Sequence, residues 1–299
     1  MSSTLLERPF ITVVVPTRNR AALLRDCLKS LIAQDFSSDH YEIIVVDDGS
    51  RDETTAVANE FATEPIGPRV HLVSQPFSGL NAARNAGLAV AGGDPICFVD
   101  DDVEAPPDWL RAMVEGAHQH ASAGCLGGRI VSRLEGRVPR QCGRESLGSV
   151  DFDAGPSDAD TERVVGANMA IRRRDLQLVG RFRPDMSGWG DEEEWQRRLR
   201  AAGGRIVYLH APWLWHRRTP DDLRLASLVS KQFRRGRERV TFMISCGENV
   251  SVWPQLVGAF RALAHAVVRG CAWGLVAASG YAGAICGLLL LRLGIQNRS

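Results

Sequence analysis

The stretch ICFVDDD (Ile96–Asp102) joins a short apolar run to three consecutive carboxylates. Four apolar residues of this kind have the length and composition of a buried β-strand. Open α/β sheets bind their ligands outside the carboxyl ends of the strands, which is where these aspartates would lie. Adjacent carboxylates repel one another unless a positive charge lies between them, and such oxygen ligands suit Mg²⁺ or Mn²⁺. The stretch therefore predicts a metal–diphosphate site at a strand tip, with a solvated acidic loop as the alternative interpretation.

Strand and helix patterns alternate along the chain around this stretch. The apolar runs that predict strands are Phe10–Val15, Tyr41–Val46, Val70–Val73 and Ile96–Val99. The segments with helical patterns between them are Ala21–Ile32, Arg51–Phe61 and Leu80–Val90. Such alternation predicts an α/β fold whose parallel strands are joined by right-handed helical crossovers. We expect one edge of the sheet to gather the polar clusters that follow its strands, which are Thr17-Arg18-Asn19, Asp47-Asp48 and Asp100–Asp102.

The composition excludes several classes of protein. The 299 residues are 44% hydrophobic and 24% charged, which is typical of a globular chain with a large core. The net charge of +1 gives no indication of nucleic-acid binding. The seven cysteines show no Cys-X-X-Cys spacing, so we expect reduced, mostly buried thiols and neither a disulfide scaffold nor a zinc site. The N-terminus is polar and lacks a signal-peptide pattern.

Eight segments of the chain, taken in order, resemble the motifs of a known protein family. The first four are VVVPTRNR (Val13–Arg20), VVDDGS (Val45–Ser50), GLNAARNAGL (Gly79–Leu88) and FVDDDV (Phe98–Val103). The later four are VVGANMAIRR (Val164–Arg173), GRF (Gly180–Phe182), GDEEEWQRRLRAAG (Gly190–Gly203) and WLWH (Trp213–His216). As an ordered set they resemble the inverting, family-two glycosyltransferases with the GT-A fold. The resemblance covers roughly residues 10–218 and implies a GT-A, Rossmann-like catalytic domain over residues 8–218, with a mostly parallel sheet flanked by helices.

The resemblance implies a set of residues that bind the nucleotide-sugar. Pro16 and Arg18 lie where such enzymes hold the nucleotide base, and Asp48 lies where a carboxylate accepts from that base. Arg84 falls at a position that contacts the donor. Taken without the resemblance, Asp48 belongs to an Asp-Gly turn before a helix. Arg84 is either a solvated helix arginine or a residue that faces the cleft and binds phosphate or a base edge.

The aspartate triplet takes the metal-binding role in this resemblance. Asp100 and Asp101 would contact the ribose and help to place the ion, and Asp102 would be its main protein ligand. His216 is a further ligand or a contact to the diphosphate, or else belongs to a packed strand end with the two tryptophans before it. A bound Mg²⁺ or Mn²⁺ would stabilise charge on the leaving nucleotide as a Lewis acid.

The catalytic base is expected in the acidic start of a later helix. Family members usually show Glu-Asp at this point, whereas this chain has the run DEEE from 191 to 194. Counting back from Arg198-Leu199 places Glu192 at the usual aspartate and Asp191 at the usual glutamate. A carboxylate here would deprotonate the acceptor hydroxyl as it attacks the anomeric carbon. The alternative is that acids in a first helical turn merely complement the helix dipole.

Two residues are candidate contacts for the acceptor. Trp189 lies in a Gly-Trp-Gly loop just before the acidic helix, where its ring would serve as a stacking platform for a sugar. Asn168 lies in the VVGANMAIRR segment and is assigned to the same acceptor region.

The chain changes character after the catalytic domain, and we expect a helical region over residues 219–299. Between Arg217 and Val240 there are eight lysines and arginines against three acidic residues. The run Cys271–Leu291 has 21 residues without charge, and about 20 apolar residues suffice to cross a bilayer. Gly283 and Gly287 have the spacing that permits close helix contact.

The sequence favours association of this C-terminal region with a membrane. Val252–Val268 is apolar but contains Arg261 and His265, a pattern typical of a helix in the membrane interface. A span across the bilayer and a soluble helical hairpin are the alternatives. Basic residues favour the cytoplasmic side, and nucleotide-sugars are cytosolic, so we expect the protein at the cytoplasmic face of the cell membrane.

The sequence thus predicts a metal-dependent inverting glycosyltransferase of cell-wall or polysaccharide biosynthesis. Its expected partners are a nucleotide-diphospho-sugar, a glycan or lipid-linked acceptor and the membrane surface, but no nucleic acid. The alternative is a non-catalytic, glycosyltransferase-like subunit that binds a nucleotide or a partner. A nucleotidyltransferase is a third class, but it should show a Gly-rich loop with Arg or Lys after the first strand, where this chain has Pro16-Thr17-Arg18-Asn19.

Overall fold

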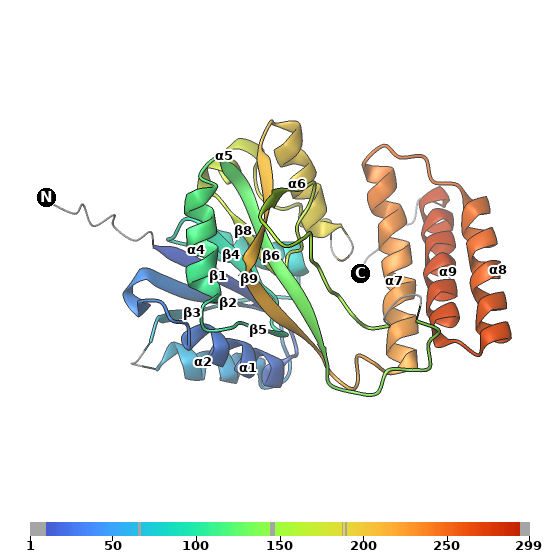
Figure 1. Cartoon of the computed structure of the whole chain (residues 1–299), viewed down its shortest axis with the longest axis horizontal. Helices are drawn as coiled ribbons and strands as arrows, with labels where there is room; N and C mark the ends of the chain where they lie inside the picture. The colour runs from blue at the N-terminus through green and yellow to red at the C-terminus, as the bar shows by residue number, and fades with distance from the viewer. Residues whose placement is uncertain (1–9, 65–66, 144–146, 187, 189, 294–299) are drawn as a thin grey trace, which may run out of the picture. The chain divides into compact units, whose positions relative to one another are not determined.

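The first half of the chain follows the predicted alternation of strands and helices (Figure 1). The structure is a computed structural model that describes residues 10–64, 67–143, 147–186, 188 and 190–293. Its first elements are β1 (Ile11–Thr17), α1 (Ala21–Ile32), a 3₁₀ turn (Ser38–His40), β2 (Tyr41–Asp48), α2 (Thr54–Ala62), β3 (Arg69–Gln75), α3 (Leu80–Val90) and β4 (Ile96–Val99). Helices α1 and α3 have the predicted bounds. Helix α2 begins later than predicted, and the Thr54 amide at its start donates a hydrogen bond of 3.0 Å to the Asp52 carboxylate.

The sheet is parallel in its first half and antiparallel beyond β4. The later elements are β5 (Val103–Glu104), α4 (Trp109–Gln119), β6 (Ala123–Leu134), β7 (Ala159–Asp160), β8 (Asn168–Ile171), α5 (Arg173–Val179), α6 (Asp191–Ala201) and β9 (Arg205–Arg218). In the described residues the strand order is β3-β2-β1-β4-β8-β6-β9-β5, with β7 on β9. Strand β1 pairs with β2 and β4 in parallel, whereas β8 pairs with β4 and β6 in antiparallel orientation. The α/β prediction is confirmed, with a mixed sheet.

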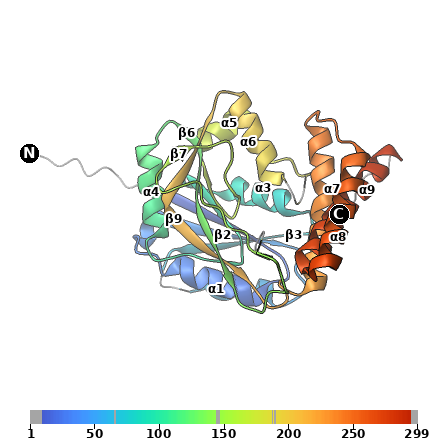
Figure 2. The ribbon, with the colours of Figure 1, turned by 45° about the vertical axis from the view of Figure 1, so that its right-hand side comes forward.

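Both faces of the parallel part are buried, as the continuous apolar runs predicted. Along β1, Val13 and Val15 pack into one core with α1, α2 and α4, while Val14 packs into a second core with α3 and α6. This alternation follows from the two-residue period of a strand. Figure 2 shows α1 and α3 on opposite sides of strand β2. Burial on both faces explains why these strands show no alternation of polar and apolar residues.

Contacts divide the chain into two compact units. The sheet unit comprises the described residues up to 131 together with 151–185 and 192–216. The helical unit comprises 132–150, 186–191 and the described residues from 217 onward. This division lies close to the expected boundary at 218, but it also assigns two earlier connecting segments to the helical unit.

The helical unit is built on α7 (Leu225–Ser245), α8 (Val252–Arg269) and α9 (Ala272–Arg292). Helix α9 lies between α7 and α8 (Figure 1). A side chain at Gly283 would collide with the backbone carbonyl of Phe233 in α7, and one at Gly287 would press on Arg237. The two glycines therefore permit the close helix contact that their spacing predicted, and its partner is α7.

Helix α8 carries a row of exposed apolar side chains on one face. We call this row the α8 stripe; it consists of Trp253, Leu256, Phe260, Leu263 and Val267. The spacing of three and four residues places all five on the same side of the helix. Helix α9 is long and apolar enough to cross a membrane by length and composition, with a mean hydropathy of 1.9, yet 44% of that segment is buried within the protein.

Candidate active site

The polar clusters that follow the strands meet at one edge of the sheet, as predicted. Thr17 at the end of β1 lies opposite Asp47 at the end of β2. The Thr17 hydroxyl donates a hydrogen bond of 2.7 Å to Asp101, beyond the end of β4. The Asn19 amide donates to the Ser50 hydroxyl at 2.9 Å, which joins the loops after β1 and β2. Parallel pairing of β2, β1 and β4 thus brings segments far apart in sequence to a common edge.

Arg20 supplies the positive charge that the adjacent carboxylates require. Its Nη1 lies 2.9 Å from Asp101 Oδ1 and 2.7 Å from Asp102 Oδ2. Both aspartates are buried, so a guanidinium between them offsets a repulsion that water screens little. Asn19, just before Arg20, has a left-handed φ of 53°, a conformation that asparagine tolerates better than most residues. The sequence reasoning did not single out Arg20, although it belongs to the motif after β1.

His216 completes the group at the tip of β4. Antiparallel pairing of β5 with β9 places His216 opposite Val103, directly after the triplet. Its Nε2 lies 3.4 Å from Asp102 Oδ1 and 3.8 Å from Asp100 Oδ2. The buried Asp102 Oδ1 accepts no hydrogen bond within the described part of the chain. One ligand atom from each of Asp100, Asp102 and His216 falls within 4.8 Å of the others.

The surroundings move the pKa values of two of these carboxyl groups in opposite directions. Burial raises the pKa of Asp101 to about 7, despite the nearby charge of Arg20. Burial also acts to raise the pKa of Asp100, but the hydrogen bond and charge of His216 outweigh it, so this pKa lies below its usual value. A cation held at the triplet would favour the ionised form of every carboxylate around it.

This donor set fits a small divalent cation. Two carboxylates and an imidazole converge, and one buried carboxylate oxygen has no hydrogen-bond partner among the residues that the structure describes. Buried polar atoms are normally satisfied, so an unsatisfied oxygen aimed at two other ligand groups indicates a missing partner. Mg²⁺ and Mn²⁺ accept carboxylate ligands and keep further positions for water or phosphate. The predicted ligands Asp102 and His216 therefore lie where they can act together, with Asp100 beside them.

The predicted base-binding residues lie around the loop after β3. Asp48 is buried, and its carboxylate accepts hydrogen bonds from the Ser78 and Gly79 amides, both at 2.8 Å, and from the Gln75 side chain at 2.7 Å. A carboxylate offers about four acceptor positions, so about one remains for a nucleotide base. Asp48 thus holds this loop in place, and its contact with the base stays a prediction.

An aromatic surface flanks this loop. The guanidinium of Arg18, an exposed residue, lies 3.7 Å from the centre of the Phe77 ring, which is 49% exposed. Pro16 is buried at the end of β1. Sequence reasoning missed Phe77, because a single phenylalanine in a loop carries no pattern. The stacked pair offers a flat surface of the kind on which planar bases stack.

Arg84 and Glu192 come together beside Gly166. The Gly166 amide donates a hydrogen bond of 3.2 Å to Glu192 Oε1. A side chain at Gly166 would collide with the end of Arg84 and contact the Glu192 carboxyl group. Arg84 is buried, donates to Asn81 at 3.1 Å, and contributes to the field that lowers the pKa of Asp100. The arginine is therefore not the solvated helix residue of the alternative interpretation.

The four acids at the start of α6 have different surroundings. Glu194 pairs with Arg198 at 2.9 Å one turn along the helix, and Glu193 lies 3.8 Å from Arg163. Asp191 is buried at the first position of the helix, and Glu192 is half-buried beside Gly166. Asp191 and Glu192, the two residues predicted as candidates for the base, remain predictions.

The two residues predicted to contact the acceptor are Trp189 and Asn168. Trp189 lies outside the described residues. Asn168 is fully buried; it accepts from the Trp109 indole at 3.0 Å and donates to the carbonyls of Arg129 and Pro212 at 3.0 and 3.1 Å. These bonds hold neighbouring elements together and leave no exposed group. The assignment of Asn168 to the acceptor therefore does not fit the structure, because a side chain sealed from solvent contacts no acceptor.

Comparison with known proteins identifies a family and several sequence relatives. Residues 12–179, more than half of the chain, match the sequence profile described as "Glycosyl transferase family 2". Glycosyltransferase AglE of Haloferax volcanii is 27% identical over 240 residues, which cover 80% of this chain and 75% of AglE. Validoxylamine A glucosyltransferase of Streptomyces hygroscopicus is 28% identical over 69% of this chain and 54% of its own length. The GalNAc(5)-diNAcBac-PP-undecaprenol beta-1,3-glucosyltransferase of Campylobacter jejuni is 35% identical over 60% of this chain and 57% of its own.

Two solved structures share the fold. Mannosyltransferase PcManGT of Pyrobaculum calidifontis, solved in complex with GDP-Man and Mn²⁺, has a TM-score of 0.60 and 21% identity over 97% of this chain and 80% of that protein. S. aureus TarS has a TM-score of 0.55 and 18% identity over 78% of this chain, but only 43% of TarS is covered. The chain thus spans about half the length of several proteins that it matches. The predicted GT-A architecture is confirmed by this structural likeness.

Proposed function

Because this chain belongs to glycosyl transferase family 2 and is a glycosyltransferase, we propose that it is a metal-dependent, inverting enzyme. It moves a sugar from a nucleotide-diphospho-sugar to an acceptor hydroxyl. The observation that carries this proposal is the unsatisfied, buried oxygen of Asp102, which faces His216 and lies beside Asp100 at the tip of β4. The relative solved with GDP-Man and Mn²⁺ supports both a nucleotide-sugar donor and a metal ion.

The residues at the strand tip would hold the cation and the donor. Asp102 and His216, with help from Asp100, would hold Mg²⁺ or Mn²⁺, which when bound neutralises the diphosphate and the charge that develops on the leaving nucleotide. Arg20 donates to both Asp101 and Asp102 and would hold the two side chains in place before the donor arrives. Asp100 and Asp101 are proposed to contact the ribose.

The base and sugar of the donor would lie along the neighbouring loops. Arg18 and Pro16 at the end of β1 are proposed to hold the nucleotide base. The remaining acceptor position of the Asp48 carboxylate would accept a hydrogen bond from an N–H group of that base. Arg84 is proposed to contact the donor from α3, since its buried guanidinium already acts on Asp100. A fixed guanidinium suits phosphate oxygens or the planar edge of a base.

Glu192 is the proposed general base. Its carboxylate would take the proton of the acceptor hydroxyl while the oxygen attacks the anomeric carbon and the bond to the diphosphate breaks. One displacement of this kind inverts the anomeric configuration. The hydrogen bond from the Gly166 amide orients the Glu192 carboxylate. Asp191 is the second candidate, since it occupies the neighbouring position at the start of α6.

We propose a glycan or lipid-linked acceptor at the cytoplasmic face of the cell membrane. The Campylobacter relative is named for a sugar chain carried on PP-undecaprenol. The α8 stripe presents exposed tryptophan, phenylalanine and aliphatic side chains on one face, which is typical of a helix lying in the membrane interface. Clustered large apolar side chains in water are unfavourable unless a partner covers them.

The packing of α9 favours attachment over a span. One side of α9 lies against α7 through Gly283 and Gly287, and α7 contains the exposed residues Arg234 and Arg239. Charged groups at the bilayer centre are costly, so the close packing of α9 against α7 supports attachment at the membrane surface over a span. The α8 stripe is proposed to make the membrane contact.

The proposal is tested by measuring nucleotide release from UDP-, GDP- and dTDP-sugars in the presence of Mn²⁺ or Mg²⁺. Replacing Asp102→Asn keeps the shape of the side chain but removes its charge, and we expect turnover to fall by on the order of 10²–10³, as several kcal/mol of charge stabilisation are lost. Asp108→Asn, at an exposed position before α4, is the matched control and should keep full activity.

Two outcomes would contradict the proposal in different ways. Activity that persists in EDTA, or an Asp102→Asn protein with normal turnover, would exclude the metal assignment. A protein that binds a nucleotide but releases none from any donor would favour the non-catalytic subunit instead. Analysis of the product anomer by NMR tests inversion directly.

A further inference from the structure

Three potential metal ligands meet in the helical unit, and none of them belongs to the site described above. Cys142 lies in the connection after β6, His265 lies in the last turns of α8, and Cys271 directly precedes α9. Cys142 Sγ lies 3.3 Å from His265 Nε2, and the ligand atoms of all three residues fall within 4.8 Å of one another. The catalytic assignment uses none of these residues.

The backbone around the three side chains is well tied together. The Ala272 amide donates a hydrogen bond of 2.8 Å to the Arg140 carbonyl, which fastens the connection after β6 to the start of α9. The Cys271 amide donates to the Ala266 carbonyl at 3.1 Å, so the turn between α8 and α9 is closed. The group therefore has a scaffold that positions Cys271 and His265 on either side of a tight turn.

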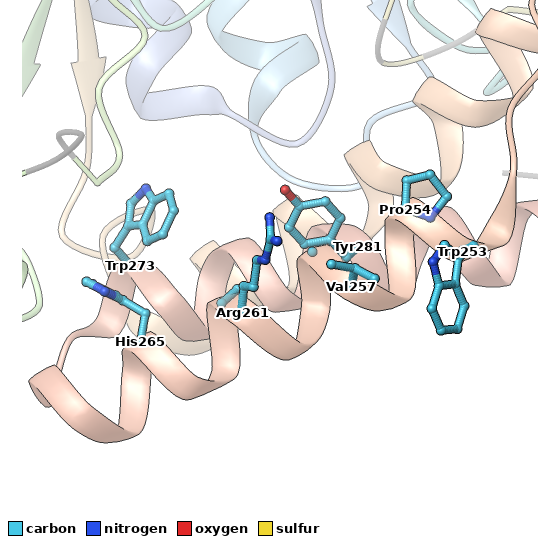
Figure 3. Close-up of a pocket in the computed structure, with 9 residues that line it drawn as sticks. Trp253, Pro254, Val257, Arg261, His265, Trp273 and Tyr281 are labelled. Atoms are coloured by element: carbon cyan, nitrogen blue, oxygen red, sulfur yellow. The ribbon is translucent and has the colours of Figure 1, made fainter.

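The imidazole is held by an aromatic neighbour. The His265 and Trp273 rings meet edge to face, with centroids 5.6 Å apart. Figure 3 shows the two side chains together at one end of a pocket of about 460 Å³ lined by α8 and α9. Cys142 is exposed and His265 borders this pocket, so an ion can enter from solvent without unfolding.

The chemistry of the three groups and the distance between Cys142 and His265 match those of a zinc site. With Zn–S bonds of about 2.3 Å and Zn–N bonds of about 2.0 Å, ligand atoms of a tetrahedral site lie about 3.5 Å apart. The measured 3.3 Å between sulfur and nitrogen agrees with this value. Thiolate and imidazole select zinc and similar borderline or soft ions, whereas the carboxylate-rich group at the tip of β4 suits Mg²⁺ or Mn²⁺.

From this geometry we propose that Cys142, His265 and Cys271 bind a zinc ion. The ion displaces the two thiol protons into solvent and accepts the lone pair of His265 Nε2, while water fills the fourth position. Bound zinc cross-links the connection after β6 to the turn between α8 and α9 and so stabilises the helical unit. The expectation from cysteine spacing alone, that the chain has no zinc site, is revised by this proposal.

Metal analysis and cobalt substitution on the full-length protein test this proposal. Protein purified with a reductant should retain about one zinc ion per chain. Replacing zinc with Co²⁺ should produce a thiolate-to-cobalt charge-transfer band, which cobalt at the carboxylate site cannot give. Cys142→Ser and Cys271→Ser should each lose the zinc and the band. Cys246→Ser and Cys286→Ser, at two half-buried cysteines outside the group, are the matched controls and should keep both.

A further variant separates metal binding from folding. His265→Cys keeps a zinc ligand at this position and should retain the cobalt band with a changed spectrum, whereas His265→Ala should weaken cobalt binding by at least about tenfold. The proposal is overturned if the wild-type protein shows no thiolate–cobalt band, or if Cys142→Ser keeps it. Recovery of a disulfide between Cys142 and Cys271, in place of bound zinc, would equally overturn it.

Discussion

Replacing Trp253 and Phe260 together by alanine should detach the protein from lipid vesicles without unfolding it. The two side chains are 72% and 73% exposed, so they contribute little to the packing of α8. Fully burying a large apolar side chain yields about 1.5–3 kcal/mol. With nearly three quarters of each surface available, we expect about 3 kcal/mol from the pair, or on the order of 100-fold in vesicle partitioning.

The assay is flotation of the full-length protein with vesicles of neutral lipid and of neutral lipid mixed with anionic lipid. Leu178→Ala is the matched control, because this leucine is 60% exposed on α5 in the sheet unit. The thermal midpoint of unfolding should stay unchanged in both proteins, since each loses only exposed surface. Attachment through the basic α7 should add to binding of anionic vesicles at low salt, by about 1 kcal/mol for each basic residue near the surface.

Three results would refute the reasoning about the α8 stripe. The first is a wild-type protein that stays soluble at low salt with either vesicle. The second is a double alanine variant that floats as well as the wild type. The third is an equal loss of binding in Leu178→Ala, which would show that the effect is not specific to α8.

The remaining predictions concern the base, an ion pair and a helix contact. Glu192→Gln should lower turnover on the order of 10²–10⁴ while donor affinity is preserved, as measured by initial rates and nucleotide binding; if Asp191→Asn is the crippling change instead, the assignment is shifted by one residue. Burial acts to raise the pKa of Asp222, but the hydrogen bond and charge of Lys231 outweigh this effect and lower the pKa to about 2. The ionised Asp222 therefore stabilises the fold fully above about pH 4, and this stabilisation is lost as the pH falls towards 2. Lys231→Met should lower the free energy of unfolding by about 1 kcal/mol at pH 7. Thermal unfolding curves should show this difference from the wild type disappearing in acid. Gly283→Leu should force α9 away from the backbone of α7 and lower the unfolding midpoint by several degrees, and an unchanged midpoint would exclude the close contact.

The elements of the parallel half could be predicted because their signals are local. The bounds of α1 and α3 matched the apolar stripe of each helix, and the runs before Asp47 and Asp100 proved to be buried strands. Parallel strands with helical crossovers place their carboxyl ends on one edge, so the meeting of these polar clusters follows from the topology. The antiparallel pairing of β8 with β4 was beyond prediction, since short strands after a long connection carry no local signal for their partner.

The hydrogen-bond partners of the predicted site residues were not visible in the sequence motifs. Asn168 lies in a matching motif, yet three buried hydrogen bonds make it part of the framework. Asp48 lies at the expected strand end, but its carboxylate also organises the loop from Gln75 to Gly79. Hydrogen-bond partners depend on which segments meet in space, and motif spacing does not report that.

The sequence by itself determined the α/β order of elements, the carboxylates at a strand tip and the basic and apolar character of the C-terminal region, because hydrophobic periodicity and charge are properties of neighbouring residues. Only the tertiary structure decided which groups share a site. Arg20 meets Asp101 from 81 residues away, and Cys142 meets His265 from 123 residues away. These long-range contacts form when distant strands and helices pack into the hydrophobic cores, and no local sequence pattern predicts them.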